Sequence, residues 1–244
     1  MGSRLGACAG AALLLVAAVP DRLHADTRVI DSPTAEPLGH GFMRWEISAG
    51  PGGSVLSGVR VGVFERAQFG LSYGMQDVLG RGDVEANPRP GIQAEVLLLD
   101  RVDFPAVALG FDSQGVGRWL EDAERYERKS HGFYAVATQS LAAESLPVLT
   151  ALTGGINYSL EGKRESFDIF LGMSQTWGRS FTLLVDYDFG LDDRLDKDRG
   201  YLDLGLQWSF GSGNHLRFIL RDLLGNVEGG KVGRELSFFY LFRL

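Results

Sequence analysis

The sequence is short of cysteine, of positive charge and of long apolar runs. Its only cysteine, Cys8, lies within the N-terminal leader described below, and the formal net charge is −7. Once the leader is removed, we expect no disulfide, no thiolate metal site and no cysteine nucleophile. The acidic balance argues against a nucleic-acid partner, because phosphate binding requires a basic surface. An exported chain without disulfides is typical of a bacterial envelope protein.

Histidine is also scarce, and this limits the chemistry that we expect. Beyond residue 25 the sequence holds only three histidines, His40, His131 and His215. An outer-membrane lipid hydrolase needs a serine and a histidine at its outer rim, and only His131 is expected there. The acidic segment LDDRLDKDR (191–199) lacks the spacing of an EF-hand, so we interpret it as a solvated loop. We therefore expect a non-enzyme with no metal and no cofactor.

The first 40 residues divide into two parts. Arg4 precedes the apolar stretch ACAGAALLLVAAVP, and the small residue Ala25 offers a cleavage position. This pattern predicts a signal peptide over residues 1–25, since the apolar run is too short to span a bilayer. Residues 26–40, DTRVIDSPTAEPLGH, are polar and have no period, which predicts a flexible periplasmic lead-in.

From residue 41 onward, apolar and polar residues alternate with a period of two, which is typical of β-strands with one apolar face. The pattern predicts twelve strands: about 41–49, 54–65, 67–78, 91–99, 104–113, 131–140, 150–161, 165–176, 179–189, two in the hairpin over 199–222, and 233–244. The facing of 131–140 is ambiguous. No long amphipathic helix is expected, and the charged segment 119–130 is assigned to a loop.

The connections between these strands alternate in length. Turns such as WGR and GSG are short, whereas most of the other set, including 79–90 and 115–130, are longer. Outer-membrane barrels have short periplasmic turns and longer outer loops, and strands of about ten residues are long enough to cross. We therefore predict an all-β fold: a single antiparallel transmembrane β-barrel of about 12 strands over 41–244, in the outer membrane of a Gram-negative-type bacterium. The alternatives are an outer-membrane lipid hydrolase and a soluble periplasmic β-sandwich or lipocalin-like binder.

If the apolar faces contact lipid, the alternate residues line the lumen. The predicted lumen-lining polar residues are Arg44, Glu46, Arg60, Glu95, Asp112, Asp168, Asp186, Asp188, Asp203, Arg217, Arg221, Glu235 and Arg243. Charges of both signs in a narrow lumen require pairing or water. Two interpretations stay open. The lumen is a passage or binding chamber for a small hydrophilic solute, or its side chains form a salt-bridged, hydrogen-bonded plug that fills a narrow barrel and has only a structural role.

Two segments resemble known envelope proteins. The final segment ELSFFYLFRL is similar to the C-terminal strand that barrel-assembly machinery recognises, although it ends on Leu244 instead of Phe or Trp. PGIQAEVLLLDRVDFPAVALGFDSQGVG, followed by GFYAVATQSL, resembles exopolysaccharide-associated barrels of the YjbH type over about 90–160. The resemblance implies a small channel or structural envelope component linked to polysaccharide export. Partners would be outer-membrane lipid and lipopolysaccharide, the assembly machinery, and a polysaccharide or small hydrophilic solute.

Overall fold

A computed structural model describes residues 26–101, 104–142, 148–162, 166–193, 200–226 and 231–244. The expected signal peptide lies outside these residues. Among the residues described, no helix is long and apolar enough to cross a membrane.

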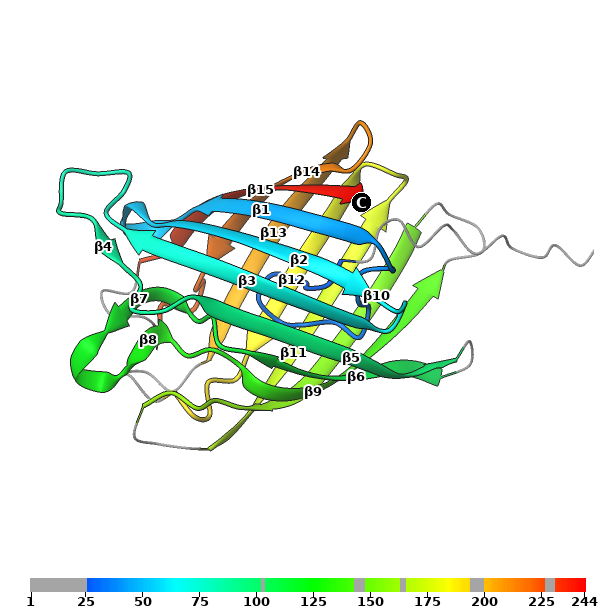
Figure 1. Ribbon diagram of the computed structural model, residues 1–244, viewed down its shortest axis with the longest axis horizontal. Coiled ribbons are helices and arrows are strands. Elements are labelled where there is room, and N and C mark those ends of the chain that lie inside the picture. The colour runs from blue at the N-terminus through cyan, green and yellow to red at the C-terminus, as the bar shows by residue number, and fades with distance from the viewer. Residues whose placement is uncertain (1–25, 102–103, 143–147, 163–165, 194–199, 227–230) are drawn as a thin grey trace, which may run out of the picture.

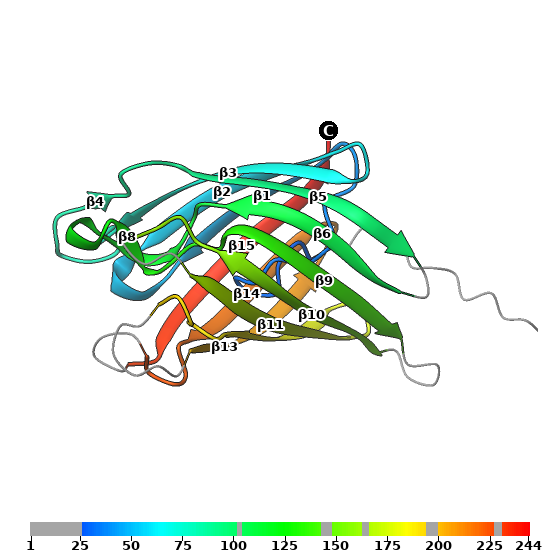
Figure 2. The ribbon, with the colours of Figure 1, turned by 90° about the horizontal axis from the view of Figure 1, so that it is seen from below.

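Twelve strands form one closed antiparallel barrel, as the alternation predicts. Their bounds are β1 (Phe42–Ala49), β2 (Val55–Val63), β3 (Ala67–Gln76), β5 (Gly91–Arg101), β6 (Phe104–Asp112), β9 (Gly132–Ala142), β10 (Val148–Tyr158), β11 (Phe167–Trp177), β12 (Phe181–Asp188), β13 (Tyr201–Phe210), β14 (Asn214–Arg221) and β15 (Gly233–Arg243). The last strand pairs with the first, from Phe42 opposite Arg243 to Ala49 opposite Leu236, so that the sheet closes (Figures 1 and 2). Closure satisfies the backbone N–H and C=O groups that an open sheet would leave unpaired at its edges.

The two ends of the barrel differ. One end, the turn end, carries short connections and the C-terminus; the other, the loop end, carries the longer loops (Figure 1). At the loop end lie η1 (Pro51–Gly53), β4 (Glu85–Ala86), which pairs with β3, and a separate two-stranded hairpin of β7 (Val116–Leu120) and β8 (Arg125–Arg128).

The β7–β8 hairpin corrects the interpretation of 119–130 as a loop. The chain reverses through the short helix η2 (Glu121–Ala123) and the left-handed Glu124, whose φ is 53°. Trp119 packs edge-on against Tyr126 with 5.1 Å between ring centroids, across the pair that the two residues form. The residues around this contact have no alternating pattern, so the hairpin could not be predicted from the sequence.

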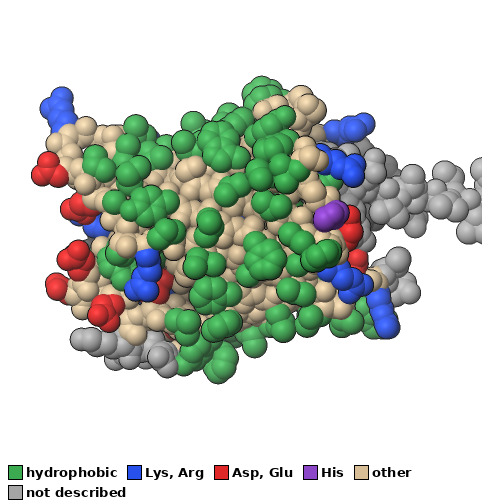
Figure 3. All heavy atoms as spheres, in the orientation of Figure 1, with side chains coloured by type: hydrophobic (Ala, Val, Ile, Leu, Met, Phe, Trp, Pro, Cys, Tyr) green, Lys and Arg blue, Asp and Glu red, His purple; other side chains and the backbone are tan. Residues whose placement is uncertain are grey.

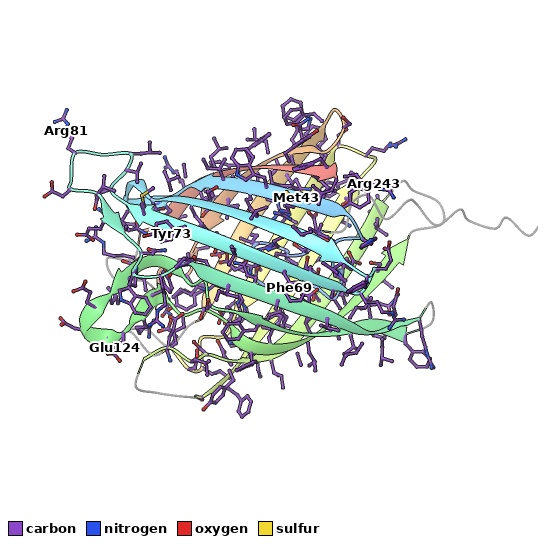
Figure 4. The ribbon with its side chains drawn as sticks, in the orientation of Figure 1. Met43, Phe69, Tyr73, Arg81, Glu124 and Arg243 are labelled. Carbon is purple, nitrogen blue, oxygen red and sulfur yellow. The ribbon has the colours of Figure 1, made fainter. Side chains whose placement is uncertain are left out.

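The outer wall of the barrel is apolar. Phe69 and Tyr73 on β3 are 55% and 42% exposed, and they point away from the barrel together with Met43 (Figure 4). Hydrophobic side chains cover the middle of the wall, and charged ones gather at its two ends (Figure 3). An apolar band around a closed barrel is the arrangement that lipid requires. It rules out the soluble sandwich, whose apolar faces would point inward.

The strand over 131–140, whose facing the sequence left ambiguous, has a clear orientation in the structure. Phe133 is 58% exposed on the outer wall, whereas Tyr134, Val136 and Thr138 are buried inside the barrel. Apolar residues occupy both faces because the inner face packs here against residues 26–40. The sequence therefore shows apolar residues on both faces of this strand.

Candidate functional site in the barrel lumen

The structure brings most of the predicted lumen residues together inside the barrel. Those that are buried are Arg44, Arg60, Glu95, Asp112, Asp168, Asp186, Asp188, Asp203 and Arg217. Glu46, Arg221 and Glu235 are less buried and line a chamber described below. Arg243 does not join them: it is exposed at the turn end, with its guanidinium 5.9 Å from the centre of the Phe42 ring (Figure 4).

Residues 26–40 fill much of the lumen, and we call this segment the plug. The flexible periplasmic lead-in expected here is corrected: Val29, Ser32, Ala35 and Leu38 are at most 2% exposed. The plug enters as a tight turn in which the Val29 N–H donates to the Ser32 carbonyl at 3.0 Å. Figures 1 and 2 show it as a loop within the ring of strands.

Asp186 on β12 anchors the tip of the plug. One carboxylate oxygen accepts hydrogen bonds from the backbone N–H groups of Ile30, Asp31 and Ser32, at 2.8–3.0 Å. The other accepts the Ser32 hydroxyl at 2.5 Å. Successive N–H groups that converge on one oxygen form a concave site for a negative charge. The buried carboxylate therefore obtains its partners from the plug.

Ion pairs attach the plug to the wall and to the hairpin. Asp31 pairs with Arg221 of β14 at 2.5 Å and with Arg128 of β8 at 3.1 Å. Both arginines also contact Asp203, at 3.1 and 2.9 Å. Further along, Arg28 pairs with Asp112 and Asp26 with Arg217. Alternating charges in contact reduce the cost of burying each one.

Apolar contacts hold the plug at two places along its length. Val29 and Ile30 pack with Leu184 and Ile219. Ala35 packs in a second cluster with Leu97, Ala108, Tyr134, Val136 and Phe170. Gly172 allows the close approach, because a Cβ there would lie 2.7 Å from Cγ2 of Val29.

A polar cluster at the loop end joins the hairpin to neighbouring loops. Arg125 pairs with Asp193 at 2.6 Å, and the Tyr201 hydroxyl donates to the same carboxylate at 2.8 Å. Glu161 accepts hydrogen bonds from the backbone N–H groups of Tyr126 and Ser130 at 3.0 and 3.2 Å. The hairpin is thus held over the loop end by charged contacts.

Asp192 belongs to the same cluster and shows the effect of its burial. Lys129 Nζ donates to the Asp192 backbone carbonyl at 3.0 Å, and its distance to the carboxylate is 3.7 Å. Burial raises the pKa of Asp192 to about 6, although the nearby Lys129 charge acts in the opposite direction. A buried carboxyl is more easily protonated than one in water, because burial disfavours its charged form.

His131 is not the exposed rim residue that a hydrolase would need. The ring is 6% exposed and lies edge-on to Phe170, with 5.1 Å between centroids, and to Tyr134 at 6.4 Å. Its Nε2 has no hydrogen-bond partner, and burial lowers its pKa to about 4. A neutral, enclosed imidazole packed between aromatic rings contributes to packing and is not placed to act as a general base.

The structure describes only residues 191–193 of the acidic loop 191–199. Asp192 and Asp193 are buried and paired as described, and the other two aspartates lie outside the described residues. Across the described chain, no group of three or more His, Cys, Asp or Glu side chains is arranged to hold a metal.

One chamber remains beside the plug. It has a volume of about 70 Å³ and lies against β1, β2, β14 and β15. Five arginines line it, Arg28, Arg44, Arg60, Arg217 and Arg221, with three carboxylates, Asp31, Glu46 and Glu235. Its lining therefore has an excess of positive charge.

Sequence reasoning missed two parts of this site. The plug residues Arg28 and Asp31 lie in an aperiodic segment, and Arg128 lies in the charged stretch that was assigned to a loop. Their only sequence signal is charge next to a strand pattern, which does not distinguish a lumen partner from a solvated residue.

The geometry defines a class: a closed twelve-stranded β-barrel with an apolar outer wall and a charged lumen is a transmembrane barrel of the outer-membrane type. Comparison with known proteins agrees at the level of fold. No protein family and no curated sequence matches the chain.

The chain is similar to several solved structures of outer-membrane channels. A KdgM porin solved in complex with disordered oligogalacturonate is 9% identical over 83% of this chain and 99% of that one, with a TM-score of 0.51. An outer-membrane channel from Pseudomonas putida F1 is 12% identical over 85% and 98%, with a TM-score of 0.49. Omp33 of Acinetobacter baumannii is 7% identical over 85% and 100%, with a TM-score of 0.46. The likeness is one of fold, and none of these comparisons supports the YjbH-type resemblance.

Proposed function

We propose that this protein is an outer-membrane channel for small hydrophilic solutes, which the plug closes in the state described. The observation that carries the proposal is the plug itself. It is not part of the barrel wall, and its tip is held by hydrogen bonds to Asp186 and ion pairs of Asp31. Polar contacts of this kind exchange with water, so the segment can leave without breaking the barrel.

The width of the barrel supports a passage. Eight strands enclose an interior that side chains fill, and the diameter grows with strand number. Twelve strands leave room for a further chain segment, which residues 26–40 occupy here. Once they are withdrawn, the remaining lumen is lined by charged side chains that water would hydrate.

The placement in the envelope follows from the same proposal. Residues 1–25 would act as a cleaved signal peptide, and the turn end would face the periplasm. The loop end, with the β7–β8 hairpin, would face outward among lipopolysaccharide. The strand over 233–244 would be the segment that the barrel-assembly machinery binds.

The solute class that we propose includes soluble saccharides, which connects with an envelope role near polysaccharide export. The KdgM porin, which shares this fold, was solved with oligogalacturonate. No observation favours the hydrolase, because the His131 ring is enclosed.

Planar-bilayer conductance tests the channel. We compare the chain of residues 26–244 with a chain of residues 41–244, which lacks the plug. We expect the longer chain to be mostly closed, and the shorter one to show steady conductance at least tenfold higher.

A second variant covers the case in which the shorter chain does not fold. Asp186→Leu retains the plug and removes its anchor, so we expect intermittent openings. If either variant folds and conducts no more than the parent chain, the barrel is a structural envelope component and the channel proposal is wrong.

A further inference from the structure

Two arginines face each other across the first two strands of the barrel. Arg44 on β1 is the direct antiparallel partner of Arg60 on β2, and both are buried on the inner face. Like charges directly opposite one another in a sheet are destabilising. A buried pair of this kind requires counter-charge, which the surrounding residues supply only in part.

Arg44 has one carboxylate partner and spare donors. Its Nη2 donates to Glu46 at 2.9 Å, whereas Nε and Nη1 are buried without a hydrogen-bond partner. The guanidinium lies over the Phe239 ring, 3.7 Å from its centre. Stacking fixes the plane of the guanidinium, and its unpaired N–H groups remain at the edge.

Arg60 has only neutral partners among the described residues. Its Nε donates to the Gln93 side chain at 3.2 Å, and its Nη1 donates to the Thr27 hydroxyl of the plug at 2.9 Å. Gly70 on β3 makes room for the side chain, because a Cβ there would lie 2.7 Å from Cγ of Arg60. Neutral hydrogen bonds position the guanidinium but leave its charge uncompensated.

Other chamber arginines are already paired. Arg217 contacts Asp26 at 2.8 Å, and Arg221 contacts Glu235 at 2.7 Å. Glu46, the carboxylate that Arg44 contacts, also accepts the Ser237 hydroxyl at 3.1 Å. Glu95, whose charge also acts on Arg60, accepts the Tyr134 hydroxyl at 2.8 Å and the Gln68 amide at 3.2 Å. The deficit of negative charge therefore lies at the Arg44–Arg60 pair.

We propose that the chamber binds a small oxyanion, a carboxylate, phosphate or sulfate group, between Arg44 and Arg60. Guanidinium groups bind such oxygens through charge-assisted, often bidentate hydrogen bonds. The volume of about 70 Å³ is large enough for one oxyanion head. The site extends the proposed function, since it makes the favoured solute an anion, but binding can be measured without any conductance.

Equilibrium dialysis of the detergent-purified barrel with radiolabelled sulfate tests the site. We expect Arg44→Gln and Arg60→Gln each to weaken sulfate binding at least tenfold. Glu46→Gln removes the competing carboxylate, so it should strengthen binding several-fold. The matched control is Arg101→Gln, which removes the same charge from an exposed position at the end of β5 and should change nothing.

Folding of each variant is verified by its mobility shift on boiling, which separates loss of the site from loss of the barrel. Arg60→Gln is the safer variant, because it removes the like-charge opposition and leaves the ion pair of Arg44 with Glu46 in place. Glucuronate and glucose, added as competitors, distinguish the source of the oxyanion. Displacement by glucuronate alone indicates an acidic sugar, and displacement by neither indicates a free inorganic ion.

Two results would overturn the inference. One is a folded parent barrel that retains no sulfate at millimolar concentration. The other is sulfate binding that persists unchanged in both folded arginine variants, which would place the ion elsewhere. Neither result bears on the conductance of the plug-deleted chain, so this site and the channel can fail separately.

Discussion

At the residue scale, Asp186 shows how a fully buried carboxylate is stabilised by a segment distant in sequence. It receives three backbone N–H groups and one hydroxyl from residues 30–32, more than 150 positions earlier. Hydrogen bonds to a charged acceptor contribute roughly 1.5–3 kcal/mol each. The plug and Asp186 therefore depend on each other: without the plug, only water could satisfy the carboxylate.

His131 gives a prediction of pH dependence. Its pKa is lowered to about 4 by burial, from an ordinary value near 6.5. Stability from the neutral ring is thus complete above pH 6.5, and it is lost as the pH falls toward 4, because the unfolded chain takes up the proton first. Between pH 7 and 4.5 the loss amounts to roughly 2–3 kcal/mol.

The variant His131→Phe removes this contribution. A phenyl ring suits the contacts with Phe170 and Tyr134, and it deletes a nitrogen that has no partner. We expect unchanged or higher stability at pH 7 and a smaller loss at pH 4.5, measured by urea unfolding at both values. An equal loss in the parent and the variant would show that the histidine is already hydrated in the folded barrel.

At the scale of elements, the β7–β8 hairpin acts through one side chain. Arg128 reaches Asp31 of the plug, Asp188 of β12 and Asp203 of β13, all within 3.2 Å. Because it links the hairpin, the plug and the wall, removing it leaves three buried carboxylates with less counter-charge. Breaking a buried pair costs about 3–5 kcal/mol, whereas an exposed pair contributes less than about 1 kcal/mol.

We therefore expect Arg128→Met to expose the hairpin to proteolysis. Limited digestion should cut within residues 116–130 at least tenfold faster than in the parent chain. Arg118→Gln is the matched control on the same hairpin, because Arg118 pairs with Asp77 at a half-exposed position, and its rate should change less than twofold. Equal rates in both variants would mean that the other loop contacts are sufficient to hold the hairpin.

At the scale of the whole molecule, stability depends on the closure between the first and last strands. Eight residue pairs join β1 to β15, and Leu244 N–H donates to the Gly41 carbonyl at 2.8 Å beyond them. A closed barrel resists detergent until it is heated, because no edge strand is available for unzipping.

Gel mobility with and without boiling tests this closure. The parent barrel should migrate as a compact band that shifts on boiling, and deletion of residues 236–244 should abolish the shift. Leu244→Phe, which restores the usual aromatic ending, should retain it, since the backbone pairing is unchanged. A heat-shifted band from the truncated chain would show that the seam is dispensable.

Much of the barrel could be predicted from the sequence, and the reason is local. Side chains on a strand alternate between faces, so Leu202, Leu204 and Leu206 against Asp203 and Gly205 indicate a strand and its two sides without knowledge of its neighbours. The contrast between short turns and longer loops supplied the orientation of the strands. Where the pattern failed, at 131–140, an interior partner had made the inner face apolar as well.

For the candidate site, the sequence predicted only which charged residues face the lumen, and not which of them contact each other. Whether Arg44 would find a carboxylate, and whether Arg243 would lie inside or at the rim, depends on register and on what else enters the lumen. Neither the register nor the content of the lumen can be deduced from the residues next to Arg44 and Arg243 in the sequence.

The sequence by itself determined the strands, their apolar faces and hence a barrel in lipid, because these follow from a two-residue period and from bilayer thickness. Only the tertiary structure decided that residues 26–40 turn back into the lumen, that the β7–β8 hairpin contacts them, and that Arg44 and Arg60 are buried opposite each other. These are long-range polar contacts between residues far apart in the chain. Their energies depend on distance and burial, which only the closed barrel fixes.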